Sequence, residues 1–93
     1  MLTQTGSGSA ATVTQTGLLD SATVIQSGQF DIATVIQNGG EFAWISQTGN
    51  NEMATVDQSG PGTGNKEYVT QTASDVTASV LQPGAGNTAT VRA

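Results

Sequence analysis

Residues 22–39 read ATVIQSGQFDIATVIQNG, in which the pattern A-x-V-x-Q-x-G occurs twice at a distance of eleven residues. Within each copy Ala, Val and Gln stand at every second position, and such positions share one face of a β-strand. The residues between them are Thr and Ile, whose β-branched side chains suit a sheet surface. The pattern therefore predicts a strand of about six residues, followed by a short arc that contains the glycine.

The same pattern continues in both directions through almost all of the 93 residues. Its glutamines recur every eleven residues, except for one interval of ten and one of thirteen, and they are Gln4, Gln15, Gln26, Gln37, Gln47, Gln58, Gln71 and Gln82. The apolar residues of the same parity, which we expect in the core, are Ala11, Val13, Ala22, Val24, Ala33, Val35, Ala43, Ile45, Ala54, Val56, Val69, Ala78, Val80, Ala89 and Val91. The glycines expected in the arcs are Gly6, Gly17, Gly28, Gly39, Gly49, Gly60 and Gly84. A repeat of this kind indicates a solenoid, because each unit buries its apolar face only against its neighbours.

One strand and one arc cannot enclose a core, whereas two such units can form a complete coil. We therefore predict an all-β fold, a two-sheet β-solenoid of 11-residue strand–arc units with about 22 residues per coil, about four coils and parallel strands stacked at about 4.8 Å. Residues one coil apart then stack, so the inward glutamines form two ladders in which the amides satisfy one another. At this length we expect a single domain over residues 1–93, uncapped at both ends.

The composition excludes several classes of protein. Seven Asp and Glu stand against two Lys and Arg, a formal net charge of −5, and there is no His and no Cys. Because the imidazole and thiol groups that bind zinc or act as nucleophiles and bases are lacking, we expect no enzyme, no catalytic residue, no metal and no cofactor. Two cations make a poor phosphate-binding surface, so we expect no nucleic acid partner. No apolar stretch approaches the roughly 18 residues of a membrane helix, so we expect no membrane insertion, and we find no signal peptide pattern.

Aromatic residues gather at outward positions of neighbouring repeats. Trp44 and Tyr68 both stand three residues before a glutamine, two repeats apart, and Phe42 lies two residues before Trp44. We expect these three side chains to form a patch on one outer face. Two interpretations remain open, a contact between filaments and aromatic pairing that stabilises the sheet.

One repeat departs from the pattern at two positions. Glu67 replaces the core alanine and Ala73 replaces the arc glycine. Since a carboxylate is costly in an apolar core, we expect a local bulge to turn Glu67 outward.

Acidic residues recur at the beginning of the strands. Asp20 with Glu41, and Asp31 with Glu52, are expected to stack because the two members of each pair lie about one coil apart in the sequence. Oxygen ligands in repeated turns can hold Ca²⁺, but the glycine-rich nonapeptide of calcium β-rolls is missing. We therefore interpret these carboxylates as solvated arc residues.

The repeat resembles that of the curlins, the subunits of bacterial curli fibres, whose repeats have the form Q-x-G-x-x-N-x-A-x-V-x-Q. Residues 82–91, QPGAGNTATV, fit every fixed position, and the other copies match Gln, Gly, Ala and Val. The place of the asparagine, called the Asn position below, is taken by Ser9, Asp20, Asp31, Glu41, Glu52, Asn65, Val76 and Asn87. The resemblance implies a functional amyloid of the extracellular biofilm matrix and cell surface, with a nucleator subunit and an outer-membrane secretion channel as partners.

The repeats also indicate a function without the resemblance. A solenoid with open ends presents unpaired strand edges, and one end is complementary to the other when the repeats are nearly alike. Such contacts do not close and produce filaments, so we expect a homopolymer that grows head to tail. The alternative is a monomeric β-solenoid that binds ice or a glycan surface, since an outward column of hydroxyls is expected from Thr12, Thr34, Thr55 and Ser79. A third interpretation is an adhesive coat protein whose folding depends on calcium.

Overall fold

The computed structural model describes residues 2–17, 19–58, 64–82 and 84–93. These residues form nine strands and no helix. The strands are β1 (Leu2–Gln4), β2 (Ala10–Gln15), β3 (Ser21–Gln26), β4 (Ile32–Gln37), β5 (Phe42–Gln47), β6 (Met53–Gln58), β7 (Lys66–Gln71), β8 (Thr77–Leu81) and β9 (Thr88–Arg92). Each strand occupies one copy of the repeat, as the period of two predicts.

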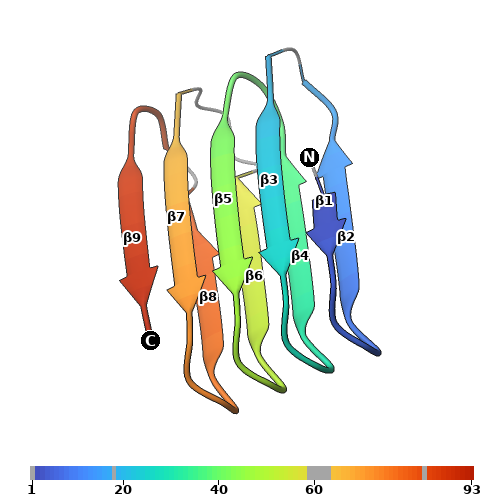
Figure 1. Cartoon of the computed structure of the whole chain (residues 1–93). Helices are drawn as coiled ribbons and strands as arrows, with labels where there is room; N and C mark the ends of the chain where they lie inside the picture. Colours follow the sequence, from blue (N-terminus) through green and yellow to red (C-terminus); the bar gives the residue numbers. More distant parts are fainter. Residues whose placement is uncertain (1, 18, 59–63, 83) are drawn as a thin grey trace.

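The strands alternate between two parallel sheets (Figure 1). The first sheet has the order β1-β3-β5-β7-β9 and the second has the order β2-β4-β6-β8. The strands of one sheet run opposite to those of the other, because each arc reverses the chain (Figure 1). Two strands and two arcs make one coil, so the predicted two-sheet β-solenoid of about four coils is confirmed.

The register is kept even where the repeat changes length. Gln47 follows Gln37 after ten residues, yet it pairs with Gln26 on one side and Gln71 on the other. The segment of thirteen residues between Gln58 and Gln71 likewise leaves Ala54 opposite Ala78 in the next strand pair. Both irregularities fall in arcs, where a changed length does not disturb the strand ladder.

The core is a thin layer between the two sheets. Burial alternates along the central strands, with the Ala, Val and Gln positions buried and the positions between them facing outward. The molecule measures 34 × 20 × 12 Å along its principal axes. Small side chains in every coil explain this flat shape, since alanine and valine leave little space between the sheets.

In the described arcs, the residue just before the Asn position adopts the left-handed backbone conformation, with a positive φ. Glycine fills this place at Gly8, Gly40, Gly64 and Gly86, and the other described arcs use Leu19, Phe30, Asn51 and Asp75, with φ between 58° and 66°. The glycines that stand two residues after the glutamines are needed for a different reason, which is the close stacking of the arcs. A Cβ on Gly28 would overlap the carbonyl oxygen of Gly49, so the arcs stack too closely for any side chain there. Gly60 lies outside the described residues.

Leu19 offers a test of the strain in these arcs. Its side chain is 92% exposed, so replacing it removes little burial. We expect Leu19→Gly to be more stable than the matched variant Leu19→Ala by about 0.5–1 kcal/mol, because relief of the left-handed strain outweighs the entropy of glycine. Urea unfolding of the dilute proteins measures this difference. Equal stabilities would show that the arc does not hold residue 19 under strain.

Candidate functional site

The inward glutamines form two continuous hydrogen-bonded ladders. In each step the Nε2 group of one glutamine donates to the Oε1 atom of the glutamine in the next coil. In the first sheet the steps are Gln4 to Gln26 at 2.7 Å, Gln26 to Gln47 at 2.9 Å and Gln47 to Gln71 at 2.8 Å. In the second sheet they are Gln15 to Gln37 at 2.9 Å, Gln37 to Gln58 at 3.2 Å and Gln58 to Gln82 at 2.7 Å. All donors point towards the C-terminal end, so the ladders have a direction.

The second N–H of each inner amide crosses to the opposite sheet. Gln26 on β3 donates to the backbone oxygen of Ala10 at 3.1 Å, where β2 begins. Gln37 on β4 donates in the same way to Ser21 at 3.0 Å, where β3 begins. These bonds satisfy the amides in the dry interior and tie the two sheets together. The amide spacing in the sequence predicts the ladders and leaves the second N–H for nearby backbone, and the structure shows that its acceptor is the first residue of a strand in the opposite sheet.

The apolar residues fall into two groups. Those of the first group are buried, and they are Ala22, Val24, Ala33, Val35, Ala43, Ile45, Ala54, Val56, Val69 and Ala78. Those of the outermost coils, on β2, β8 and β9, are only partly covered, and they are Ala11, Val13, Val80, Ala89 and Val91. Val13 is 36% exposed although its counterparts in the inner coils are fully buried. Both ends of the solenoid therefore expose core positions.

The acidic residues at the Asn position bind the backbone of the arcs. Asp31 accepts a hydrogen bond from the N–H of Gly28 in its own arc at 3.2 Å. It accepts another from the N–H of Glu52 in the next coil at 3.1 Å. Asp31, Glu41 and Glu52 are buried, so the interpretation of solvated carboxylates is wrong for these three. The tight arc turns the side chain inward, where it satisfies N–H groups that no strand can reach.

The carboxylate of Glu52 differs from the others at the Asn position. It is buried, and neither of its oxygens accepts a hydrogen bond. Burial raises the pKa of Glu52 above its ordinary value. The Gly49 amide opposes this effect in part, and the nearby carboxylate of Asp31 adds a smaller upward effect.

Glu67 is the other buried carboxylate without a partner. The expected bulge is absent, because Glu67 stays in register between Ala43 and Ala89 and is completely buried. Val69 and Gln71 further along β7 explain the difference, since their inward positions force Glu67 to the same face. Neither oxygen of Glu67 accepts a hydrogen bond. Burial raises the pKa of Glu67 from its ordinary 4.5 to about 7.

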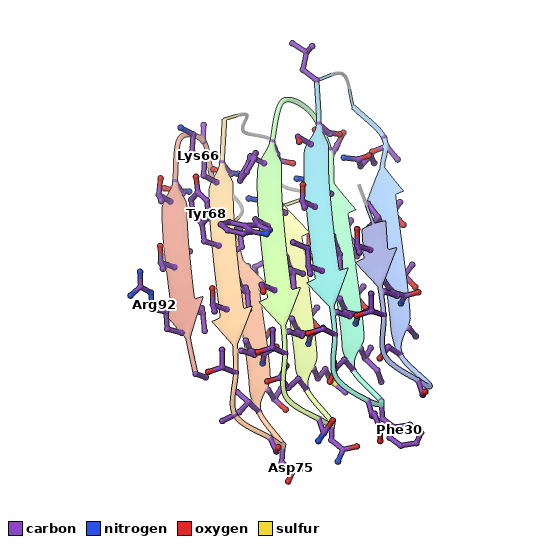
Figure 2. The ribbon with its side chains drawn as sticks, viewed as in Figure 1. Phe30, Lys66, Tyr68, Asp75 and Arg92 are labelled. Carbon is purple, nitrogen blue, oxygen red and sulfur yellow. The ribbon has the colours of Figure 1, made fainter. Side chains whose placement is uncertain are left out.

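The outer face of the first sheet carries the aromatic patch. The ring of Tyr68 lies 6.2 Å from that of Trp44 at 80° and 5.5 Å from that of Phe42 at 48°. Lys66 and Arg92 lie on the neighbouring part of this sheet, on β7 and β9 (Figure 2). The edge-to-face geometry fits aromatic pairing within the sheet, and Trp44 remains 41% exposed.

The outer face of the second sheet carries the expected hydroxyl column, which is in register. Its members are Thr12, Thr34, Thr55 and Ser79. The adjacent column mixes chemistries, since Ile36 lies between Thr14 and Asp57, and Leu81 follows them. A regular two-column hydroxyl array is therefore not present on the described strands.

The two ends of the solenoid present strand edges of opposite type. Directly after β9, the N–H of Ala93 donates to Thr70 and its oxygen accepts from Thr72, so these groups face β7. Alternate residues face opposite neighbours in a parallel sheet, which directs the N–H and C=O groups of Thr90 away from β7. On β2, the N–H of Ala10 faces β4 and donates to Asp31 at 2.8 Å. The backbone groups of Val13 therefore point to the other side, where no described strand lies.

These two edges are complementary to each other and not to themselves. Inside the solenoid, an outward residue of one coil bonds an inward residue of the next, as Ile32 does when its N–H donates to the oxygen of the buried Glu52 at 2.7 Å. The edge of β9 offers outward residues such as Thr90, and the edge of β2 offers inward residues such as Val13. A junction between β9 and β2 would thus repeat the bonding found within the chain.

The described residues contain no group of three acidic side chains able to hold a metal ion. Over the same residues the chain forms no helix long and apolar enough to cross a membrane. The chain matches no protein-family model, no curated protein and no solved structure. The resemblance to curlins therefore stays a prediction.

The buried carboxyl of Glu67 predicts a pH-dependent stability. Because its pKa rises from 4.5 to about 7 on folding, the folded state binds the proton more tightly than the unfolded state. The contribution of Glu67 to the free energy of unfolding should therefore be most favourable below about pH 4.5 and should fall as the pH rises towards 7. We expect Glu67→Gln, which mimics the protonated form, to be the more stable protein at pH 8.

Urea unfolding of the dilute proteins between pH 4 and pH 8 provides the measurement. Subtracting the curve of Glu67→Gln removes the contributions of the other carboxyls, including Glu52. A difference between the two proteins that does not vary with pH would show that Glu67 is not held in the dry core.

Proposed function

We propose that this chain is a structural subunit that polymerises head to tail into an amyloid-like fibre. The observation that carries the proposal is the complementarity of the two ends, where β9 offers the backbone pattern that β2 requires. A contact between two different surfaces of identical chains does not close on itself and produces a filament. Soluble proteins normally block such edges with proline, charge or a covering element, and β2 carries none of these among its residues.

Burial supports the same proposal. The inner coils show how well the core positions are covered once a coil lies on each side, since Val35 and Val56 are fully buried. Joining two chains would cover Val13 and Val91 in the same way, because both occupy the corresponding position of the repeat. Val13 is only 36% exposed in the single chain, so covering it would contribute about a third of the roughly 1.5–3 kcal/mol of a side chain that passes from full exposure to full burial.

The place of the fibre is proposed from the resemblance to curlins. That resemblance supports an extracellular fibre of the cell surface or biofilm matrix, with a nucleator subunit and a secretion channel as further partners. The strongest match is residues 82–91, which fit the curlin pattern at each fixed position from its first Gln to its Val.

A second candidate function is a monomeric module that binds ice or a glycan surface. The in-register column Thr12, Thr34, Thr55 and Ser79 favours it. The solenoid fold is compatible with both functions, and the state of the purified protein distinguishes them. Persistent monomers support the binding module, and unbranched fibrils support the fibre subunit.

We expect the purified chain to form unbranched fibrils in neutral buffer, with strands perpendicular to the fibril axis. Electron microscopy detects the fibrils, and fibre diffraction should give a meridional spacing of about 4.7–4.8 Å. A chain that stays monomeric, or fibrils without this reflection, would contradict the proposal.

A proline variant tests whether the strand edge is the joining surface. Thr90→Pro removes an N–H from the free edge of β9 while the bonds of Ala93 to β7 remain. We expect this variant to fold, to form no fibrils alone, and to shorten wild-type fibrils when added in small amounts. The matched variant Thr90→Val keeps the N–H and should polymerise normally. Normal fibrils from Thr90→Pro would show that β9 is not a joining surface.

A further inference from the structure

The strand count constrains how one chain can follow another. The nine described strands alternate between the sheets, so β1 and β9 both lie in the first sheet. The first sheet has five strands and the second has four. At the C-terminal end β9 therefore extends one strand beyond β8, as Figure 1 shows. Because the strands alternate between the sheets, the next strand of the solenoid would pair with the free edge of β8 in the second sheet.

A second chain stacked in the same orientation cannot use that place. Its β1 would belong to the first sheet and would lie on β9, and its β2 would follow in the second sheet. The edge of β8 would then face a gap one strand wide, about 4.8 Å of missing sheet in every junction. Unpaired backbone groups and exposed core positions beside such a gap are costly.

We propose that successive chains in the fibre are related by a half-turn about the fibre axis, so that β1 of the next chain pairs with β8 and its β2 pairs with β9. This inference rests on the proposed function. The half-turn brings the first sheet of the next chain over the second sheet of the previous chain, and it also reverses the direction of its strands. Since the strands of the two sheets run in opposite directions (Figure 1), the strands that meet at the junction are parallel. The alternation of strands then continues through the junction without a gap.

The amide ladders support this arrangement. Gln82 accepts from Gln58 at 2.7 Å and donates one N–H to the oxygen of Lys66 at 3.2 Å. No described residue accepts its second N–H, which in the inner coils goes to the next glutamine. Gln4 donates to Gln26, and no described residue donates to its own oxygen. With the half-turn, Gln4 of the next chain lies over Gln82 and the ladder continues.

The ladder of the first sheet has no such opening. Gln71 gives its N–H groups to the oxygens of Met53 at 3.0 Å and Val76 at 3.1 Å. The next residue of this column is Ala93, which has no amide side chain. The open donor therefore lies on the sheet to which the half-turn brings Gln4.

The second strand of the joint also fits. Extending the register places Ala11 over Ala89 and Val13 over Val91. The free backbone groups of Thr90 then meet those of Val13, which repeats the bonding between β7 and β9. Two successive chains together contribute nine strands to each sheet. At the usual strand spacing, the structure of the fibre therefore repeats about every 43 Å along its axis. The aromatic patch would alternate between the two faces of the fibre.

Cysteine cross-linking distinguishes the two arrangements, and the chain has no native cysteine to interfere. The half-turn places Thr12 of one chain beside Thr90 of the previous one, at about 4.8 Å between Cα atoms, which permits a disulfide. The same orientation would instead place Thr3 of one chain beside Arg92 of the previous one, because both occupy the same register column of the first sheet. Within one chain neither pair can join, because Thr12 and Thr90 lie on different sheets and β3, β5 and β7 separate Thr3 from Arg92.

We expect oxidised fibrils of the double variant Thr12→Cys, Thr90→Cys to give a series of covalent multimers on a non-reducing gel. The matched double variant Thr3→Cys, Arg92→Cys, which the same orientation would join, should remain monomeric on the same gel. The reverse result, or no multimers from either variant in fibrils, would overturn the half-turn.

Imaging of the wild-type fibril makes the test independent of the variants. Helical reconstruction should give a rotation close to half a turn between successive chains, whereas a rotation near zero would overturn the inference and leave the fibre proposal intact. Absence of wild-type fibrils would instead overturn the proposed function itself.

Discussion

The hydrogen bond between stacked glutamine amides is the interaction on which the rest of the structure depends. The interior between the sheets is too thin for large apolar side chains, and its inner columns are alanine, valine and glutamine. A buried amide is stabilising only when its donors and acceptors are paired. Here each inner amide bonds the next coil and the opposite sheet, so a slip of one residue would break both kinds of bond. The ladders thus specify the register that the small core alone would leave loose.

In the arcs, buried hydrogen-bond donors must also be paired, but here the donors are backbone N–H groups. Backbone N–H groups in the arcs cannot join a strand ladder, and the side chains at the Asn position accept their hydrogen bonds. Asn65 shows the arrangement with an amide, since its oxygen accepts the N–H of Asn87 at 3.0 Å. Glu52 and Glu67 are the exceptions, because both are buried without partners. Polar groups of this kind cost stability, and the raised pKa of each shows how the chain avoids the full cost of a buried charge.

The sequence predicted the architecture well because two strong signals agree. Alternation of Ala, Val and Gln defines the strands and their inward face, and the eleven-residue spacing defines the coil. The errors have physical causes: Glu67 stays inside because Val69 and Gln71 fix the parity of β7, and Asp31 is buried because a tight arc folds it back on Gly28. The left-handed arc position could not be recognised, since Leu19 and Phe30 occupy it where glycine would be expected. The half-turn depends on counting strands in each sheet, which requires the observed topology.

Hydrogen exchange of the glutamine side-chain amides, followed by nuclear magnetic resonance, tests the central claim most directly. Gln37 and Gln47 are buried in the ladders, whereas Gln29 lies exposed in an arc and serves as an internal reference. The account predicts that the side-chain amide protons of Gln37 and Gln47 exchange far more slowly than those of Gln29. Equally fast exchange at all three would show that the amides face water, and it would contradict a solenoid held together by inward glutamine ladders.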